Sequence, residues 1–147
     1  MKVDGVPTRP IRLSADGETV EIIDQTKLPH SFAFVRLATL AEAADAITSM
    51  RVRGAPLIGA TAAYGVALAM RVDPSDLGLA TAHRTLLATR PTAVNLRWAL
   101  DDMAKVLRQC PPARRREAAY RRAAEICDED VAINEAIGRH GLALLRA

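Results

Sequence analysis

The chain of 147 residues has few aromatic side chains, few cysteines and none of the common short catalytic motifs. Phe, Trp and Tyr together make up 3% of it, so a core has to be built from aliphatic side chains and alanine. Its two cysteines, Cys110 and Cys127, are too far apart for a paired-cysteine metal motif and predict no disulfide framework. A G-x-G-x-x-G fingerprint, a Walker loop and an H-E-x-x-H motif are also missing, which argues against the dinucleotide-binding, P-loop and zincin classes.

The sequence also lacks a strong excess of charge and an apolar run near Met1. Twenty basic and 17 acidic residues give a net charge of +3, which is too small to indicate a nucleic-acid partner. Without an apolar run there is no predicted signal peptide, and we expect a cytoplasmic protein. The histidines His30, His83 and His140 are widely separated, so they predict surface or packing roles and no metal site. The length and composition indicate one globular domain.

What is present is an uncharged segment, Gly54–Met70, flanked by Arg53 and Arg71 and rich in Ala and Gly. A helix without charge on any face is usually buried, and small residues let neighbouring backbones approach closely. Pro56 suits the first turn of such a helix. A membrane span is the alternative, but the run is shorter than the roughly 20 residues that a bilayer requires. We therefore predict a central buried helix.

Two arginines precede predicted helix starts, Arg53 beside Gly54 and Arg90 beside Pro91. A helix N-terminus presents free N–H groups and a partial positive charge, both of which attract anions. A guanidinium adds a forked donor suited to phosphate. The pattern is compatible with an anion site, and it leaves open a structural turn before a core helix.

The remaining pattern predicts an α+β fold in which a small antiparallel β meander is followed by a helical bundle. Residues 1–38 would hold the meander and residues 39–147 the helices, together as one domain. The expected strands are Ile11–Leu13, Val20–Ile23 and Ser31–Leu37. Asp16-Gly17 is a strong hairpin signal between the first two strands.

Local signals place the helices. Thr39 and Glu42 have the spacing of a capping box. A further helix is expected from about Asp76 to Thr89. The next one would begin after Thr92, a candidate cap, and carry Trp98 on its apolar stripe.

A long amphipathic helix is predicted after Pro111-Pro112. Its apolar stripe consists of Ala119, Ala123, Ile126, Ile133, Ile137 and Leu144. Asp130 and Asn134 interrupt the stripe, and we expect them to cap or to hydrogen-bond across helices. The helix also carries a basic cluster: Arg114, Arg115, Arg116, Arg121 and Arg122. A solvated helix face is the favoured interpretation of this cluster over a nucleic-acid surface, because no aromatic residues are interleaved with it.

Several stretches carry a family resemblance. They are Asp24-Gln25-Thr26 with Leu28-Pro29, residues 50–59 (MRVRGAPLIG), residues 62–65 (AAYG) and residues 90–96 (RPTAVNL). In this order they resemble the N-terminal part of the methylthioribose-1-phosphate isomerases. The wider family includes ribose-1,5-bisphosphate isomerase and the alpha, beta and delta regulatory subunits of translation initiation factor 2B. The RPTAVNL form is closer to the sugar-phosphate isomerase branch.

The resemblance implies an aldose–ketose isomerase of methionine salvage that converts 5-methylthioribose 1-phosphate to 5-methylthioribulose 1-phosphate. It implies no cofactor and no metal, and a homodimer. By position in the motifs, the substrate-binding residues would be Arg53, Gly54, Ala55 and Arg90.

Family members are about twice as long, with a catalytic cysteine in a Thr-His-Cys-Asn stretch and a later catalytic aspartate. Neither stretch is present in this sequence, and Cys110 and Cys127 do not match that cysteine. The resemblance therefore implies that the catalytic cysteine and aspartate of the family lie beyond Ala147, and that this chain contains no catalytic residue.

We therefore expect the N-terminal domain of a two-domain isomerase, without its Rossmann-like catalytic domain and inactive alone. Its partners would be a sugar phosphate and the C-terminal catalytic domain. Three alternatives stay open: a related ribose-1,5-bisphosphate isomerase, a non-catalytic regulatory subunit that binds a sugar phosphate or nucleotide, and a stand-alone helical interaction module.

Overall fold

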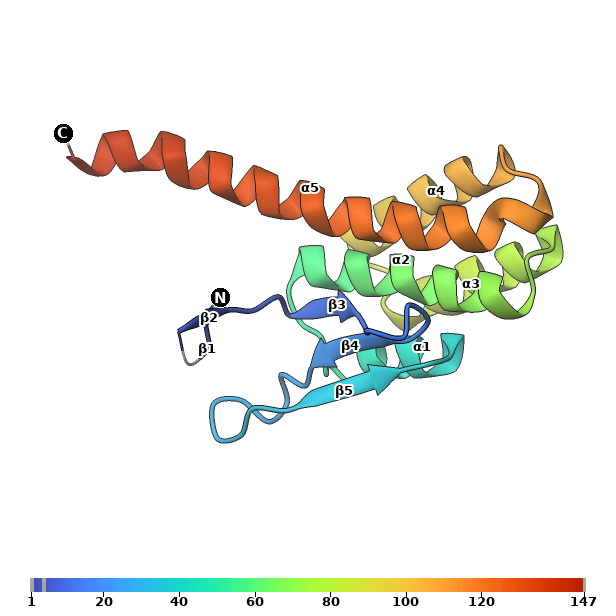
Figure 1. Cartoon of the computed structure of the whole chain (residues 1–147), viewed down its shortest axis with the longest axis horizontal. Helices are drawn as coiled ribbons and strands as arrows, with labels where there is room; N and C mark the ends of the chain where they lie inside the picture. The colour runs from blue at the N-terminus through green and yellow to red at the C-terminus, as the bar shows by residue number, and fades with distance from the viewer. Residues whose placement is uncertain (1, 4, 147) are drawn as a thin grey trace.

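The computed structural model describes residues 2–3 and 5–146, in which short strands precede a bundle of helices (Figure 1). The strands are β1 (Lys2–Val3), β2 (Val6–Pro7), β3 (Ile11–Leu13), β4 (Val20–Ile23) and β5 (Phe34–Leu37). β1 and β2 form an antiparallel pair, and the other three form an antiparallel sheet in the order β3–β4–β5. The predicted α+β fold is confirmed, while the β1–β2 pair had no signal in the sequence.

The third strand of the meander is shorter than predicted. It begins at Phe34 because the preceding chain is still turning: the Ser31 N–H donates to the Lys27 carbonyl at 2.9 Å. Within β5, Phe34 and Arg36 face solvent, and Leu37 is buried opposite Val20. The sheet therefore covers the helices with one face only.

Five helices follow in the described part of the chain: α1 (Leu40–Thr48), α2 (Ala55–Val72), α3 (Asp76–Thr89), α4 (Val94–Arg108) and α5 (Pro112–Arg146). The predicted capping box of α1 is present. Thr39 Oγ1 accepts from the Glu42 N–H at 3.2 Å, and Glu42 Oε2 accepts from the Thr39 N–H at 3.0 Å. α3 starts with a cap as well, since Ser75 Oγ accepts from the Gly78 N–H.

α2 is the centre of the molecule and contacts each of the other four helices. Every residue from Leu57 to Leu68 is buried. The helix is long and apolar enough to cross a membrane, but 72% of it is buried inside the protein, as expected of a core helix. Gly59 permits the close contact with α4, because a Cβ there would lie 3.0 Å from the Asn95 carbonyl oxygen.

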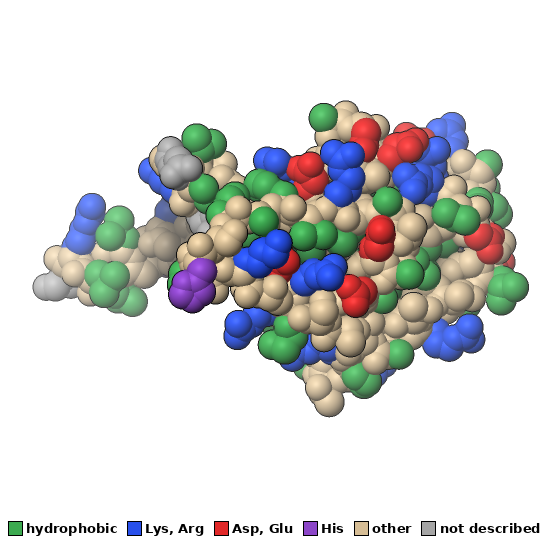
Figure 2. Space-filling view, turned by 90° about the horizontal axis from the view of Figure 1, so that it is seen from below, with side chains coloured by type: hydrophobic (Ala, Val, Ile, Leu, Met, Phe, Trp, Pro, Cys, Tyr) green, Lys and Arg blue, Asp and Glu red, His purple; other side chains and the backbone are tan. Residues whose placement is uncertain are grey.

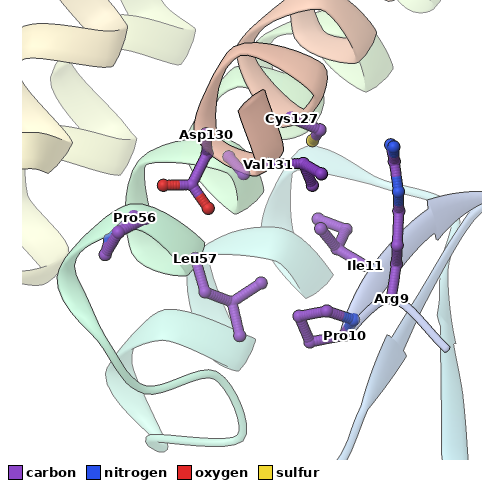
Figure 3. Close-up of a pocket in the computed structure, with 9 residues that line it drawn as sticks. Arg9, Pro10, Ile11, Pro56, Leu57, Cys127, Asp130 and Val131 are labelled. Atoms are coloured by element: carbon purple, nitrogen blue, oxygen red, sulfur yellow. The ribbon is translucent and has the colours of Figure 1, made fainter. Parts of the chain in front are cut away.

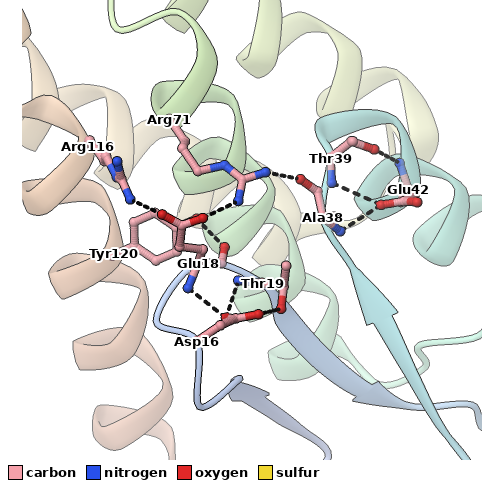
Figure 4. A network of polar contacts seen from close by, with 9 residues as sticks. All are labelled: Asp16, Glu18, Thr19, Ala38, Thr39, Glu42, Arg71, Arg116 and Tyr120. Carbon is pink, nitrogen blue, oxygen red and sulfur yellow. Dashed lines mark hydrogen bonds and ion pairs between the residues drawn. The ribbon is translucent and has the colours of Figure 1, made fainter.

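A polar network fastens the β3–β4 turn to the far end of α2 (Figure 4). Arg71 donates to the Ala38 carbonyl at 2.8 Å and to the Glu18 carboxylate at 3.4 Å. Arg116 of α5 donates to the same carboxylate at 2.7 Å, and the Tyr120 hydroxyl donates to the Glu18 carbonyl. The sheet, α2 and α5 are thus joined around Glu18.

Only the first part of α5 is covered by the rest of the protein, and its later part projects beyond the helical body (Figure 1). Ile126 is buried, but Ile133, Ile137 and Leu144 are 58%, 64% and 83% exposed. The predicted continuous apolar stripe is therefore buried in its first half alone. The helical segment was predicted to extend to Ala147; α5 is described as far as Arg146, and Ala147 lies outside the described residues.

The Asp130–Asn134 prediction was wrong in its partner. Asn134 Nδ2 donates to Asp130 of the same helix, at 2.8 Å to the carbonyl and 3.2 Å to the carboxylate. The pair is therefore a contact within α5, and among the described residues its hydrogen bonds join no second helix.

The basic cluster is not a uniformly solvated face. Arg115 is only 4% exposed, and its guanidinium links three helix ends. Its acceptors are the carbonyls of Leu107, Cys110 and Pro74 and the Asp76 carboxylate. The solvated interpretation was wrong for this residue, which lies in phase with the buried Ala119.

On the face drawn in Figure 2, basic and acidic side chains are interspersed.

Candidate functional site: a cleft between two helix N-termini

A cleft of about 440 Å³ opens where the first turns of α2 and α4 come together. We call it the N-terminal cleft. It is lined by Gly54, Ala55, Ile58, Arg90, Thr92, Ala93, Val94 and Asn95. The cleft thus combines the start of α2, the α3–α4 connection and the first turn of α4.

Local backbone geometry brings these segments together. Gly54 has φ +95°, a left-handed conformation that favours glycine, and its carbonyl accepts the first helical hydrogen bond of α2 from Ile58. α3 ends at Thr89, with Arg90 as its C-cap, and the Ala93 N–H donates to the Arg90 carbonyl at 3.0 Å, so a tight turn leads into α4. The close contact of Gly59 with α4 then holds the two helix starts side by side.

Both helices at the cleft begin without a side-chain cap. Gly54 and Ala93 occupy the N-cap positions. At neither position does a side chain of the described residues accept a hydrogen bond from an N–H group of the first turn. Thr92, predicted as the cap of α4, lies one position too early for that role. The N–H groups of both first turns, which Pro56 of α2 lacks, therefore point outward, and no described side chain accepts a hydrogen bond from them.

The first turns of these two helices also carry no acidic residue, in contrast to the described starts of α1 and α3. α1 has Glu42 in its first turn and α3 has Asp76, which balance the partial positive charge of a helix N-terminus. At the N-terminal cleft that charge is left for another group to balance. Two such helix ends in one concavity make a site for an anion with several acceptor oxygens.

Three of the four predicted substrate-binding residues line this cleft. Gly54, Ala55 and Arg90 line it, whereas Arg53 is exposed just before the start of α2 and is not a lining residue. Within the described chain, the side chains of Arg53 and Arg90 form no hydrogen bond or ion pair, while Arg51 pairs with Asp45 at 3.3 Å. Two guanidiniums near the cleft thus remain available to a ligand.

Sequence reasoning did not name Thr92, Val94 and Asn95 as site residues, although they belong to the RPTAVNL stretch that carried the resemblance. Their signal was this motif, because nothing in the helical period separates them from ordinary first-turn residues. The lining of the cleft offers a guanidinium, a hydroxyl, an amide and main-chain groups. Among these described residues there is no carboxylate, thiol or imidazole, so the cleft can bind and orient but supplies no general base.

The cysteines lie elsewhere. Cys127 lines a separate cavity of about 70 Å³ with Arg9 and Asp130, between residues 9–11, α2 and α5 (Figure 3). Burial raises the pKa of the Cys127 thiol to about 11, which keeps it protonated and unreactive at neutral pH. In the portion that the structure describes, no three His, Cys, Asp or Glu side chains gather as a metal site would require.

Comparison with known proteins agrees with the motifs. The sequence model of the Initiation factor 2 subunit family matches residues 51–147, which begin just before the cleft and include all of its lining. The chain belongs to this family. A methylthioribose-1-phosphate isomerase of Paramagnetospirillum magneticum is 60% identical over 147 residues, which are 100% of this chain and 41% of that protein.

Two solved structures have the same fold over the part that they share with this chain. The 5-methylthioribose 1-phosphate isomerase of Pyrococcus horikoshii superposes with a TM-score of 0.83 and 34% identity, over 90% of this chain and 39% of that one. The translation initiation factor eIF-2B subunit delta of A. fulgidus gives 0.77 and 36%, over 85% and 38%. The chain thus spans about two fifths of the length of each of these three proteins.

Proposed function

We propose that this chain forms the sugar-phosphate-binding part of an aldose–ketose isomerase that converts 5-methylthioribose 1-phosphate to 5-methylthioribulose 1-phosphate in methionine salvage. The observation that carries the proposal is the N-terminal cleft, where two uncapped helix starts and Arg90 meet. A phosphate dianion placed there would accept main-chain N–H bonds from α2 and α4 and a forked bond from Arg90. The 60% identity to a protein named for this activity supports the choice of sugar phosphate.

In this proposal the chain binds and orients the substrate, and the acid–base groups come from a further part of the enzyme, beyond Ala147. Moving hydrogen between C2 and C1 of the sugar requires such groups. The lining of the cleft, as far as the structure describes it, contains no carboxylate, thiol or imidazole that could act as a general base. Holding the phosphate fixes the carbon chain relative to the catalytic groups, which is a large part of the rate enhancement in such reactions.

The test is a chimera in which this chain replaces the matching 147 residues of the Paramagnetospirillum magneticum isomerase. We expect the chimera to turn over 5-methylthioribose 1-phosphate. Arg53→Lys and Arg90→Lys should each lower kcat/KM about ten- to a hundredfold, because lysine keeps the charge and loses the forked bond, worth roughly 1.5–3 kcal/mol. A folded chimera without turnover, or arginine variants with full activity, would contradict the proposal.

A second candidate is a non-catalytic regulatory subunit, favoured by the resemblance to the eIF-2B subunit delta structure at 36% identity. Such a protein would bind a sugar phosphate or nucleotide through the same cleft without converting it. The chimera separates the two candidates if binding is measured beside turnover, since a regulator's cleft binds the ligand and leaves it unchanged.

A further inference from the structure

The projecting part of α5 exposes an apolar stripe that no described residue covers (Figure 1). Ile133 and Ile137 are more than half exposed, and the apolar surface continues onto α4. There Trp98, predicted on the apolar stripe of its own helix, is 51% exposed and lines the same concavity as Ile133. Gly138 lies in the projecting part with no atom near its Cβ position, and glycine weakens an exposed helix. This segment would therefore gain stability from a second helix packed on its apolar face.

The stripe has the spacing of a coiled-coil seam. Its members alternate at intervals of four and three residues, which keeps their side chains on one face of the helix. They are Ile126, Asp130, Ile133, Ile137, His140 and Leu144.

This spacing reads the same in both directions along the helix, with its centre at Glu135. If a second copy of α5 lies antiparallel across this centre, Ile133 of each copy faces Ile137 of the other. Asp130 of each copy then faces the second copy's His140. The result is an apolar centre with one carboxylate–imidazole layer on either side. A parallel pair would instead place Asp130 against Asp130, which charge repulsion disfavours.

Both polar members of the stripe are available for such a contact. Among the described residues, the Asp130 carboxylate accepts a hydrogen bond from the Asn134 amide and forms no ion pair. The His140 side chain is exposed and has no hydrogen-bond partner in the described part of the chain. Beside the seam stand the small residues Ala136 and Gly141, which let a second helix approach closely.

We propose that α5 is a docking surface for α5 of a second copy of this chain, in an antiparallel pair centred on Glu135. Ile126 is already buried where α5 joins the helical body, so the positions from Asp130 to His140 carry the contact. A contact of this extent is smaller than a standard interface, and we expect a dissociation constant in the micromolar range. The proposal does not depend on the proposed function, because no residue of the stripe lines the N-terminal cleft.

Sedimentation equilibrium of the 147-residue chain measures the pairing. Ile137→Asp should raise the dissociation constant at least about a hundredfold, because each dimer loses two buried isoleucines. Leu142→Asp is the matched control, since Leu142 is also exposed, at 44%, but lies on the opposite face of α5. It should leave the dissociation constant unchanged. Circular dichroism melts at submicromolar concentration, where the chain is monomeric, should be the same for both variants and the parent chain.

A charge exchange tests the antiparallel register. His140→Asp places carboxylates opposite carboxylates and should weaken pairing about tenfold. Adding Asp130→Lys to this variant restores opposite charges across the seam and should recover most of the affinity. In a parallel pair the double variant would recover nothing, because like residues would still face one another.

Three results would overturn the proposal. One is a parent chain that stays monomeric at tens of micromolar, which would leave the stripe to a different partner. Another is an equal loss of pairing in Ile137→Asp and Leu142→Asp. The third is a folded double charge variant that pairs no better than His140→Asp alone.

Discussion

Adding the missing cap to α4 should stabilise the protein and at the same time weaken its phosphate site. Ala93 has extended backbone geometry, with φ −78° and ψ 106°, so the change Ala93→Asp suits an N-cap without rearrangement. A capping aspartate in place of alanine is worth about 1 kcal/mol, which for a chain of this size raises Tm by roughly 2–4 °C. The same carboxylate would occupy the first-turn N–H groups and repel a dianion. Losing one charge-assisted hydrogen bond should weaken binding about ten- to a hundredfold.

The assay is a thermal melt with and without a sugar phosphate, together with calorimetric titration. Ser75→Ala is the matched control, because Ser75 is the existing cap of α3, which lies outside the cleft. It should lower stability by about 1 kcal/mol and leave ligand affinity unchanged. If Ala93→Asp stabilises the protein and binds the ligand as well as the parent chain does, the uncapped helix starts have no role in binding. The structural-turn interpretation would then be right.

Three further changes test the packing and electrostatics. Arg115→Met should lower the free energy of unfolding in urea by about 3–5 kcal/mol, because it leaves buried carbonyls without a hydrogen-bond donor. Arg114→Met, at an exposed position, should lower it by less than about 0.5 kcal/mol. Equal losses would show that the buried guanidinium is dispensable. Hydrogen bonds from Thr19 and from the Glu18 N–H lower the pKa of Asp16 to about 2 from 3.8, so its stabilising effect is complete above pH 4 and lost as pH falls toward 2. The stability difference between the parent chain and Asp16→Asn should therefore shrink across this range, and a constant difference would contradict the assignment. Because the pKa of the Cys127 thiol is raised to about 11, iodoacetamide should modify it at pH 8 at least tenfold more slowly than a small free thiol, as followed by mass spectrometry; a comparable rate would mean that the thiol is accessible.

Local chemistry explains why much of the fold could be predicted. Some signals depend only on three or four neighbouring residues and can be recognised without tertiary structure. They include the capping box at Thr39 and Glu42 and the Asp16-Gly17 turn. The uncharged character of α2 likewise indicated burial before any partner was known. The predictions that failed concern which helix faces are covered by other parts of the protein. The periodicity of α5 marks Ile133 as apolar but cannot say whether anything covers it.

The candidate site was partly predictable for the same reason. Gly54 and Arg90 could be found because the sequence places an arginine beside a conformationally special residue before each predicted helix start, Arg53 beside Gly54 and Arg90 beside Pro91. That the two helix starts meet is a tertiary fact, which depends on Gly59 admitting the carbonyl of Asn95. Arg115 had a usable signal that was overlooked, because it is in phase with the buried Ala119 and so lies on the core side of α5.

The donors that face the N-terminal cleft belong mainly to the main chain, and this affects how the site can be studied and how it can change. Every amino acid except proline carries the same N–H group, so an alanine scan would leave most of the binding groups intact and report a site made of its arginines alone. Substitution by proline at N–H positions, or insertion of a carboxylate beside them, probes what alanine cannot. By the same logic, side chains in the first turn of α4 can vary widely among relatives while the geometry of anion binding persists. Similarity in such a cleft is better judged by superposing backbone nitrogens than by aligning residue identities.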